Sequence, residues 1–272
     1  MNSDFEFPQN SDSDASFGEI LVRERAKAPP ATYLPLPMLG GRPEFAPLAR
    51  ALGEARLEMN ALEAPGWRPS RALQALYRLA DRISAGVAAA YPESRCREGC
   101  SGCCTYPTAY FLVLPREWEA IRDWVEANWD DAARHRFAAR YRRTHGPHGL
   151  ALWLAERVMR LPWNLHLRPG ALNLSCPFLE DDRCSIHPVR PLLCRTYGSY
   201  AVRDAWRKDI EAYACRWQAD ALDAAFLDGK GRPALPSVNR LHDLRIRHGG
   251  GGGRSLARWI RLSWPWRSRG GA

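Results

Sequence analysis

Residues 96–104 read C-R-E-G-C-S-G-C-C, so four cysteines fall within nine residues. Cysteines that only fill a core behave as small apolar residues and would be scattered over helix faces. Gly99 and Gly102 lie inside this cluster, and glycines let a backbone fold back so that several sulfur atoms approach one ion. The spacing from Cys100 to Cys103 is a common chelate spacing for tetrahedral zinc and also occurs in iron–sulfur loops. The stretch therefore predicts metal ligation.

The adjacent pair Cys103 and Cys104 is the unusual part of this stretch. Neighbouring side chains tend to point apart, so two sulfur atoms reach one metal only through a special turn. Two arrangements remain open. In one, the second cysteine of the pair bridges the metal or binds a second ion nearby; in the other, one cysteine binds and its neighbour packs.

A second set of cysteines follows 72 positions after Cys104, and no cysteine lies elsewhere in the chain. We expect both sets to contribute ligands. The eight candidate metal ligands are Cys96, Cys100, Cys103, Cys104, Cys176, Cys184, Cys194 and Cys215.

The second set begins around a predicted β-hairpin, in which Cys176 and Cys184 flank a turn at 180–183. If Asp181 and Asp182 form a two-residue turn, Cys176 faces His187 and lies about 10 Å from Cys184. A looser turn would let both sulfur atoms share a metal. His187 is the only histidine near a cysteine, and it is either a ligand or a hydrogen-bonding structural residue.

Cys194 and Cys215 are predicted on helices. The first helix runs from Pro188 to Tyr197 and ends at Gly198, and it places Arg190 four residues before Cys194. The second carries an apolar stripe of Trp206, Ile210, Tyr213 and Trp217, with Cys215 off that stripe.

Positive charge near the cysteines would favour thiolate over thiol. Five arginines are expected to offset the thiolate charge: Arg95, Arg97, Arg190, Arg195 and Arg216.

Composition bounds the compartment and the class of protein. The chain has 272 residues, 46% apolar and 25% charged, which is ordinary for a globular protein. No segment is apolar enough to span a bilayer, and the acidic start lacks the features of a signal peptide. We therefore predict a cytoplasmic protein, where clustered thiols indicate metal or redox chemistry rather than a disulfide framework. No phosphate-binding loop, nucleic-acid motif or catalytic residue is identifiable.

The chain divides into three predicted parts. Residues 1–45 are acidic and then proline-rich, and are expected to be disordered. Residues 46–235 form the cysteine-cluster domain, with helices at 48–62, 70–91, 115–125, 135–143 and 150–161 and a short strand at 110–114. Residues 236–272 contain five consecutive glycines and are expected to be a flexible basic tail. Its arginines and tryptophans suit an anionic partner.

These motifs resemble the YkgJ-like, or CxxCxxCC, cysteine-cluster family of zinc- or iron-chelating domains. The resemblance covers about residues 95–216 and is carried by C96-R-E-G-C-S-G-C-C104, C176-P-F-L, C184-S-I-H, R190-P and C194-R-T-Y. The first gap holds three residues, where the family's name implies two. The resemblance implies a metal-binding domain that holds zinc or an iron–sulfur cluster.

The expected fold is mainly α with a small irregular cysteine-rich β element, its helices packed around a metal centre. The leading function is binding of zinc or an iron–sulfur centre through the eight cysteine thiolates. One alternative is an iron–sulfur redox or group-transfer enzyme. The other is an interaction module that uses zinc as a staple.

Overall fold

The fold is that of a computed structural model, which describes residues 46–92, 101, 104, 112–159, 174–198, 200–203, 210–213, 235–236 and 239–264. These residues are mainly helical, with three short antiparallel strand pairs. This confirms the expected fold class of α-helices with few short strands. The predicted segment 1–45 lies outside the described residues.

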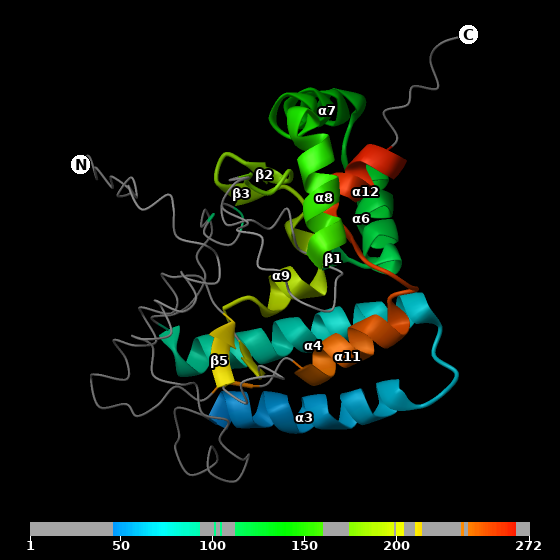
Figure 1. The fold of residues 1–272 in the computed structure, drawn as a ribbon. Coiled ribbons are helices and arrows are strands. Elements are labelled where there is room, and N and C mark those ends of the chain that lie inside the picture. The colour runs from blue at the N-terminus through cyan, green and yellow to red at the C-terminus, as the bar shows by residue number, and fades with distance from the viewer. Residues whose placement is uncertain are drawn as a thin grey trace, which may run out of the picture.

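The lower layer in Figure 1 is built from α3 (Ala46–Glu63), α4 (Pro69–Ala90) and α11 (Asn239–His248). The side chains of α4 are buried along one face, with Leu76 and Leu79 fully inaccessible to solvent. Gly86 allows α3 to approach closely, because a Cβ there would lie 3.1 Å from the Leu48 Cα. The buried side chains of α3 and α4 form one cluster, which we call the helical core. Leu241 and Leu244 of α11 also belong to it.

The predicted start of α4 was wrong by a residue or two. Arg68 is its N-cap and Pro69 occupies the first turn, so Ser70 is already helical. Proline suits this position because its missing N–H has no partner in a first helical turn. The helix ends as predicted, with Tyr91 as the C-cap immediately before Pro92.

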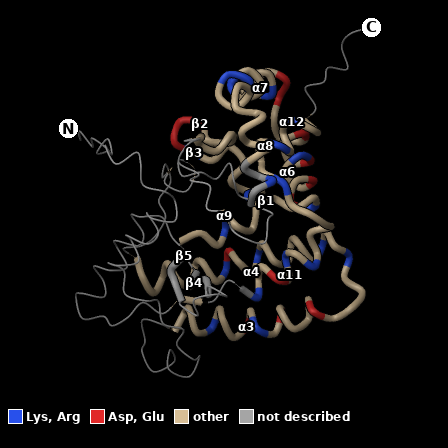
Figure 2. The backbone as a smooth tube through the Cα atoms, in the orientation of Figure 1, with Lys and Arg blue, Asp and Glu red and all other residues tan. Residues whose placement is uncertain are grey.

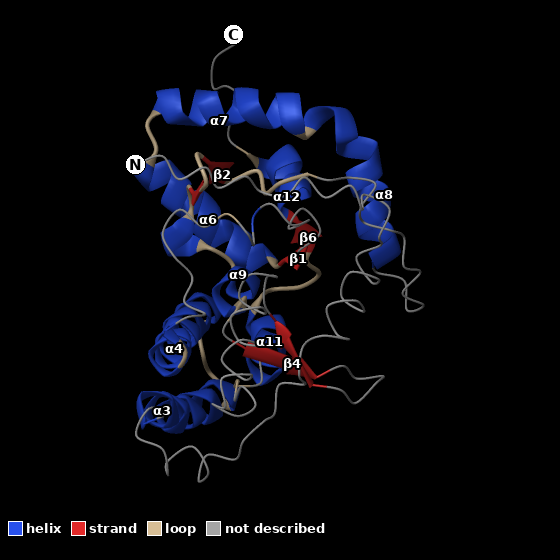
Figure 3. Ribbon diagram, turned by 90° about the vertical axis from the view of Figure 1, so that its left-hand side faces the viewer, coloured by secondary structure: helices blue, strands red, loops and turns tan. Residues whose placement is uncertain are grey.

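The upper layer contains α6 (Pro115–Asn128), α7 (Asp131–Thr144), α8 (Gly149–Met159) and α12 (Leu256–Ser263). A 3₁₀ turn, η4 (Gly146–His148), separates α7 from α8, in agreement with the predicted break. Figure 3 shows α7 lying across the end of this layer. We call the cluster inside it the aromatic core, since Trp118, Phe137, Tyr141, Phe178 and Trp264 pack there.

The second cysteine-bearing segment begins beside the upper layer, where its hairpin lies, and ends between the two layers at its short helix (Figure 1). It consists of β2 (Leu179–Glu180), β3 (Arg183–Cys184), the 3₁₀ turn η6 (His187–Val189) and α9 (Leu192–Thr196). The single helix predicted over 188–197 was wrong, because the chain is extended at Arg190 and Pro191. Residues that precede a proline are disfavoured in helical conformation, which explains the division.

The helix predicted from Trp206 to Trp217 was also wrong over its described part. Strand β5 (Ile210–Tyr213) pairs antiparallel with β4 (Tyr200–Arg203), with Tyr200 opposite Tyr213. The spacing of Ile210 and Tyr213 fits one face of a helix, but the partner strand satisfies the backbone groups instead. The strand partner lies in the segment just before β5, and the spacing of apolar residues within one segment does not report such a pairing.

The expected flexible tail was wrong for residues 239–264. Helix α11 packs on α4, β6 (Arg254–Ser255) pairs with β1 (Leu112–Val113), and α12 enters the aromatic core. Trp259 donates its indole N–H to the Val113 carbonyl at 2.8 Å, and Trp118 donates to the Ser263 hydroxyl at 2.6 Å. The tryptophans at 259 and 264 therefore pack against the protein.

Close packing explains why the glycine run begins at Gly249. The Arg116 N–H donates to the Gly249 carbonyl at 3.0 Å. A Cβ at Gly249 would collide with Leu114 Cδ1 and would lie 2.7 Å from the Arg245 carbonyl oxygen. The run thus serves as a tight junction between α11 and α6.

Substitution of this glycine should reveal that junction. We expect Gly249→Ala to lower the free energy of unfolding by about 2 kcal/mol, because the added methyl group overpacks a filled space. The matched control is Gly53→Ala in the exposed face of α3, where a Cβ would meet nothing within 4 Å; it should raise stability by about 0.5 kcal/mol. Urea unfolding followed by circular dichroism measures both. Equal effects of the two substitutions would show that residue 249 lies in a flexible segment.

Candidate metal centre

The hairpin that carries two of the predicted ligands has a tight two-residue turn. Asp181 and Asp182 have φ values of 47° and 57°, and Leu179 pairs with Cys184. Two consecutive positive φ values define a type I′ turn, which matches the twist of flanking strands. Of the two turns that the sequence left open, the structure has the two-residue turn and not the looser one that would let Cys176 and Cys184 share a metal; Cys184 lies on the strand after the turn.

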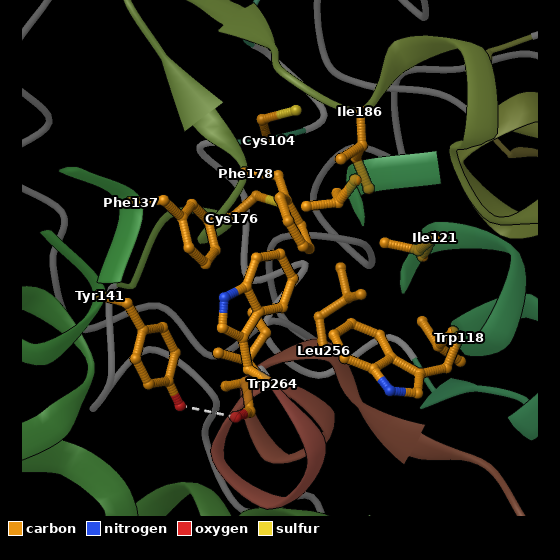
Figure 4. Packing of buried hydrophobic residues seen from close by; sticks show 14 of the residues in the cluster. Cys104, Trp118, Ile121, Phe137, Tyr141, Cys176, Phe178, Ile186, Leu256 and Trp264 are labelled. Carbon is orange, nitrogen blue, oxygen red and sulfur yellow. Dashed lines mark hydrogen bonds between the residues drawn. The ribbon is translucent and has the colours of Figure 1, made fainter. Parts of the chain in front are cut away.

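A backbone hydrogen bond joins the two cysteine motifs. The Cys176 N–H donates to the Cys104 carbonyl at 2.6 Å, although 72 positions separate the two residues. Both cysteines are 8% exposed and belong to the aromatic core. Figure 4 shows them at one edge of that core, beside Phe178 and Ile186.

The backbone around Cys176 is held at four consecutive residues. His145 Nε2 lies 3.0 Å from the Ser175 carbonyl, and Arg140 donates to the Pro177 carbonyl at 3.3 Å. Ser185 donates to the Phe178 carbonyl through both its N–H and its hydroxyl, each at 2.9 Å. Since fixed backbone orients the side chain it carries, Cys176 is pre-positioned before any metal binds.

The other two described cysteines lie at different places. Cys184 packs against the aromatic core and is partly buried, so it accompanies Cys104 and Cys176. Cys194 lies on α9, whose Leu192 belongs to the helical core. No disulfide links these four cysteines to one another. Three of them therefore share one core, and the fourth lies at the boundary between the two cores.

The other predicted ligands and charge-balancing arginines lie outside the described residues. These are Cys96, Cys100, Cys103 and Cys215, together with the arginines Arg95, Arg97 and Arg216. Among the residues that are described, no three cysteine, histidine or acidic side chains converge as a metal site does. His187 begins η6, and its role as a ligand stays a prediction.

Two arginines predicted to balance thiolate charge are engaged elsewhere. Arg195 is 6% exposed, pairs with Asp81 of α4 and lies 4.4 Å over the ring of Tyr77. It also donates to the carbonyls of Arg190 and Pro188. Arg190 lies 3.8 Å from the same Asp81 carboxylate and does not share a helical face with Cys194. These arginines fix the start of α9 on α4, which is a structural role.

Sequence reasoning missed the groups that hold the cysteine segment in place. Arg140 of α7 pairs with Glu180 of the hairpin at 2.8 Å, in addition to its bond with Pro177. The only sequence signal was the arginine-rich character of 134–143, which does not identify a partner. Arg140 thus brings a positive charge to the residue that follows Cys176, through its hydrogen bond to the Pro177 carbonyl.

A buried carboxylate connects the cysteine segment to both layers. Glu117 is fully buried and accepts bidentate hydrogen bonds from Arg245 of α11, at 3.0 and 2.7 Å to its Oε2. It also accepts from the backbone N–H groups of Leu114 and Leu192, each at 2.9 Å. Leu192 is the first residue of α9. One side chain thus fixes the beginnings of α6 and α9 and the end of α11.

Two histidines, one buried and one partly buried, are expected to make the fold sensitive to acid. Burial lowers the pKa of His145, whose Nε2 must carry the proton because the Ser175 carbonyl can only accept. Burial, with Arg245 nearby, lowers the pKa of His242 to about 4. Such a histidine has a lower pKa in the folded than in the unfolded protein. Its contribution to stability is complete at pH values above the unfolded pKa and is lost as the pH falls through that range towards the folded pKa.

Acidification should therefore destabilise the protein through these residues. For His242 the unfolded chain binds the proton more tightly, so stability should fall as the pH drops from about 6.5 to about 4. The contribution is about 3 kcal/mol over that window. We expect His242→Gln to reduce the pH dependence of urea unfolding, while His135→Gln, an exposed histidine of α7, should leave it unchanged. If His242→Gln left the pH dependence of the unfolding free energy unaltered, His242 would not be the group responsible for it. Any effect of thiolate protonation is common to both variants and therefore drops out of the comparison between them.

Comparison with known proteins supports the metal assignment. Residues 95–216 match the family model CxxCxxCC, described as a "putative zinc- or iron-chelating domain". This confirms the predicted resemblance over the same residues and indicates a metal-chelating segment. No curated protein and no solved structure matches the chain.

None of the described helices is long and apolar enough to cross a bilayer.

Proposed function

We propose that the chain holds zinc or an iron–sulfur centre through cysteine thiolates of both motifs. The observation that carries this proposal is the backbone hydrogen bond between Cys176 and Cys104, which brings the two motifs together inside one core. The family match over 95–216 supports the same class of ligand. Clustered thiolates are soft donors, which suit zinc, copper(I) and iron–sulfur clusters rather than magnesium or calcium.

The described cysteines fit such a centre in two respects. Cys104 and Cys176 are both buried among aromatic side chains, where a metal would be shielded from water. Cys176 stands on a backbone held by His145, Arg140 and Ser185. A bound metal would supply the positive charge that stabilises thiolates in these apolar surroundings. The loop at 93–103 would supply the remaining ligands.

Metal analysis and a visible absorption spectrum of anaerobically purified protein test this proposal. Iron with acid-labile sulfide and a coloured spectrum would identify an iron–sulfur centre, which allows electron transfer or group-transfer chemistry. Stoichiometric zinc in colourless protein would identify a structural staple. Purified protein that contains neither metal and takes up neither would overturn the proposal.

Site variants connect the metal to these residues. Cys104→Ser and Cys176→Ser should each lower the bound metal substantially, since a hydroxyl is a poor ligand for a soft metal. Ala257→Ser is the matched control, because Ala257 is 1% exposed in the same core and gains the same buried hydroxyl. Metal loss in the two cysteine variants but not in the alanine variant is the expected result. Full metal content in the cysteine variants would exclude these two residues as ligands.

A further inference from the structure

An apolar stripe on α8 faces solvent. Leu150, Trp153, Leu154 and Arg157 lie at i, i+3, i+4 and i+7 and so share one face of the helix. Leu150 is 77% exposed and Leu154 is 51% exposed. Exposed leucines are ordinary when scattered singly, but a contiguous stripe indicates an interaction surface.

Helix α12 extends this surface. It lies beside α8 at the edge of the upper layer (Figures 1 and 3), and Leu262 is 53% exposed. A hollow of about 370 Å³ lies along the contact between the two helices. It is lined by Leu150 and Trp153 from α8 and by Arg258, Arg261 and Leu262 from α12. We call this surface the α8–α12 face. It consists of the apolar side chains of Leu150, Trp153, Leu154 and Leu262 and the neighbouring Arg157, Arg258 and Arg261.

Positive charge surrounds the apolar side chains of this face. The guanidinium of Arg157 lies 5.3 Å from the centre of the Trp153 ring. Arg261 lies over Gly149, where a Cβ would come within 2.8 Å of its Nη1. Neither arginine forms an ion pair with a carboxylate of the described residues. Residues 149–159 and 254–264 together contain four arginines and one glutamate. Figure 2 shows where the Lys and Arg positions lie along the backbone of this layer.

The composition of the α8–α12 face distinguishes between two potential binding partners, a second copy of the chain and a lipid surface. A second copy of the chain, packed face to face, would bring like charges together at the arginines, which is unfavourable. A lipid surface suits the arrangement, because protruding leucines can enter the acyl region, tryptophan prefers the headgroup level, and arginines meet lipid phosphates. Charge complementarity therefore favours an anionic bilayer.

We propose that the α8–α12 face binds the surface of an anionic lipid bilayer. The helices lie in the interface plane and do not span the membrane. Binding combines burial of leucine side chains with electrostatic attraction, and both contributions are needed at ordinary ionic strength. The proposal does not depend on the metal centre.

Co-sedimentation of the full chain with vesicles tests this proposal. We expect binding to vesicles of phosphatidylcholine mixed with an equal amount of phosphatidylglycerol, and much weaker binding to phosphatidylcholine alone. The double variant Leu150→Glu and Leu154→Glu should reduce the partition coefficient by about tenfold or more. Arg261→Gln should reduce it by about fivefold, and the reduction should shrink at high salt, where attraction is screened.

Leu57→Glu provides the matched control. Leu57 is 71% exposed on α3 in the lower layer, away from α8 (Figure 1), and its replacement adds one negative charge, as each of the two replacements on α8 does. It should leave vesicle binding almost unchanged. An equal loss in this control would show general electrostatic attraction of a basic protein and would overturn the proposal.

Two other results would also overturn it. One is the absence of binding to the mixed vesicles by the unaltered chain. The other is a concentration-dependent dimer, seen by light scattering, that Leu150→Glu dissociates; this would assign the face to a second copy. Since the replaced side chains are exposed, circular dichroism should show that every variant keeps its helical content.

Discussion

Removal of the metal is expected to loosen the cysteine segment while the helical core persists. Structural zinc stabilises small zinc-binding folds by about 10 kcal/mol or more. Here the effect should be confined, because α3, α4 and α11 have their own buried side chains, such as Leu76, Leu79 and Leu241. The aromatic core instead packs directly on Cys104, Cys176 and Cys184.

Hydrogen exchange after chelation measures this difference. The N–H groups of Cys176 and Leu192 should lose protection, since Cys176 donates to Cys104 and Leu192 begins α9 of the cysteine segment and donates from it to Glu117 of α6. The N–H groups inside α4 should stay protected. We expect the apparent Tm to fall by about 10 °C or more, which corresponds to several kcal/mol for a chain of this size.

Reloading the metal is the control for this experiment. It should restore both the protection pattern and the Tm, which excludes damage by the chelator. Unchanged protection at Cys176 in the stripped protein would mean that the two motifs are held together by packing alone. That result would separate the fold of the segment from its metal.

Loss of the buried carboxylate should be the most damaging change outside the cysteines. Glu117→Ala leaves Arg245 as an uncompensated buried charge and removes the acceptor of the Leu114 and Leu192 N–H groups. Breaking one partner of a buried ion pair costs about 3–5 kcal/mol. We expect a decrease of this size in the free energy of unfolding.

A double-mutant cycle isolates the pair itself. Arg245→Met alone should also be destabilising, because Arg245 donates to the Leu112 carbonyl as well as to Glu117. The double variant Glu117→Ala and Arg245→Met should cost less than the sum of the single variants, since no buried charge is then left alone. Additive effects would contradict direct coupling between the two side chains.

Glu119→Ala is the matched control for the carboxylate. Glu119 lies two residues away on α6 and pairs with Arg116 at 3.1 Å on the exposed surface. Exposed pairs contribute about 0–1 kcal/mol, so this change should be nearly neutral. A metal-content measurement on Glu117→Ala adds a further readout, because a displaced α9 would also displace Cys194.

The local features of this chain could be predicted from its sequence. Apolar spacing located α3, α4 and α6, and proline marked the start of α6 and the end of α4. The two aspartates at 181–182 predicted the hairpin turn, because positive φ favours short polar residues there. The clustered cysteines predicted a metal-chelating segment, and the family match over 95–216 agrees.

The sequence did not reveal which separate elements pair with each other. Strand β5 was expected to be helical because its partner β4 could not be read from periodicity. The glycine run and the tryptophans after it suggested a flexible tail, yet Gly249 packs on α6 and Trp264 fills the aromatic core. In both cases the deciding contacts join separate elements of the structure, which the spacing of apolar residues within one element does not report.

The sequence by itself indicated a metal-chelating segment and determined where the chain would turn. Only the tertiary structure decided that Cys104 and Cys176 meet, that Arg195 pairs with Asp81, and that Glu117 holds the beginning of α9. The physical reason is that ligand chemistry and turn preference are properties of a short stretch. A buried charge or a shared hydrogen bond exists only after distant segments have packed against each other.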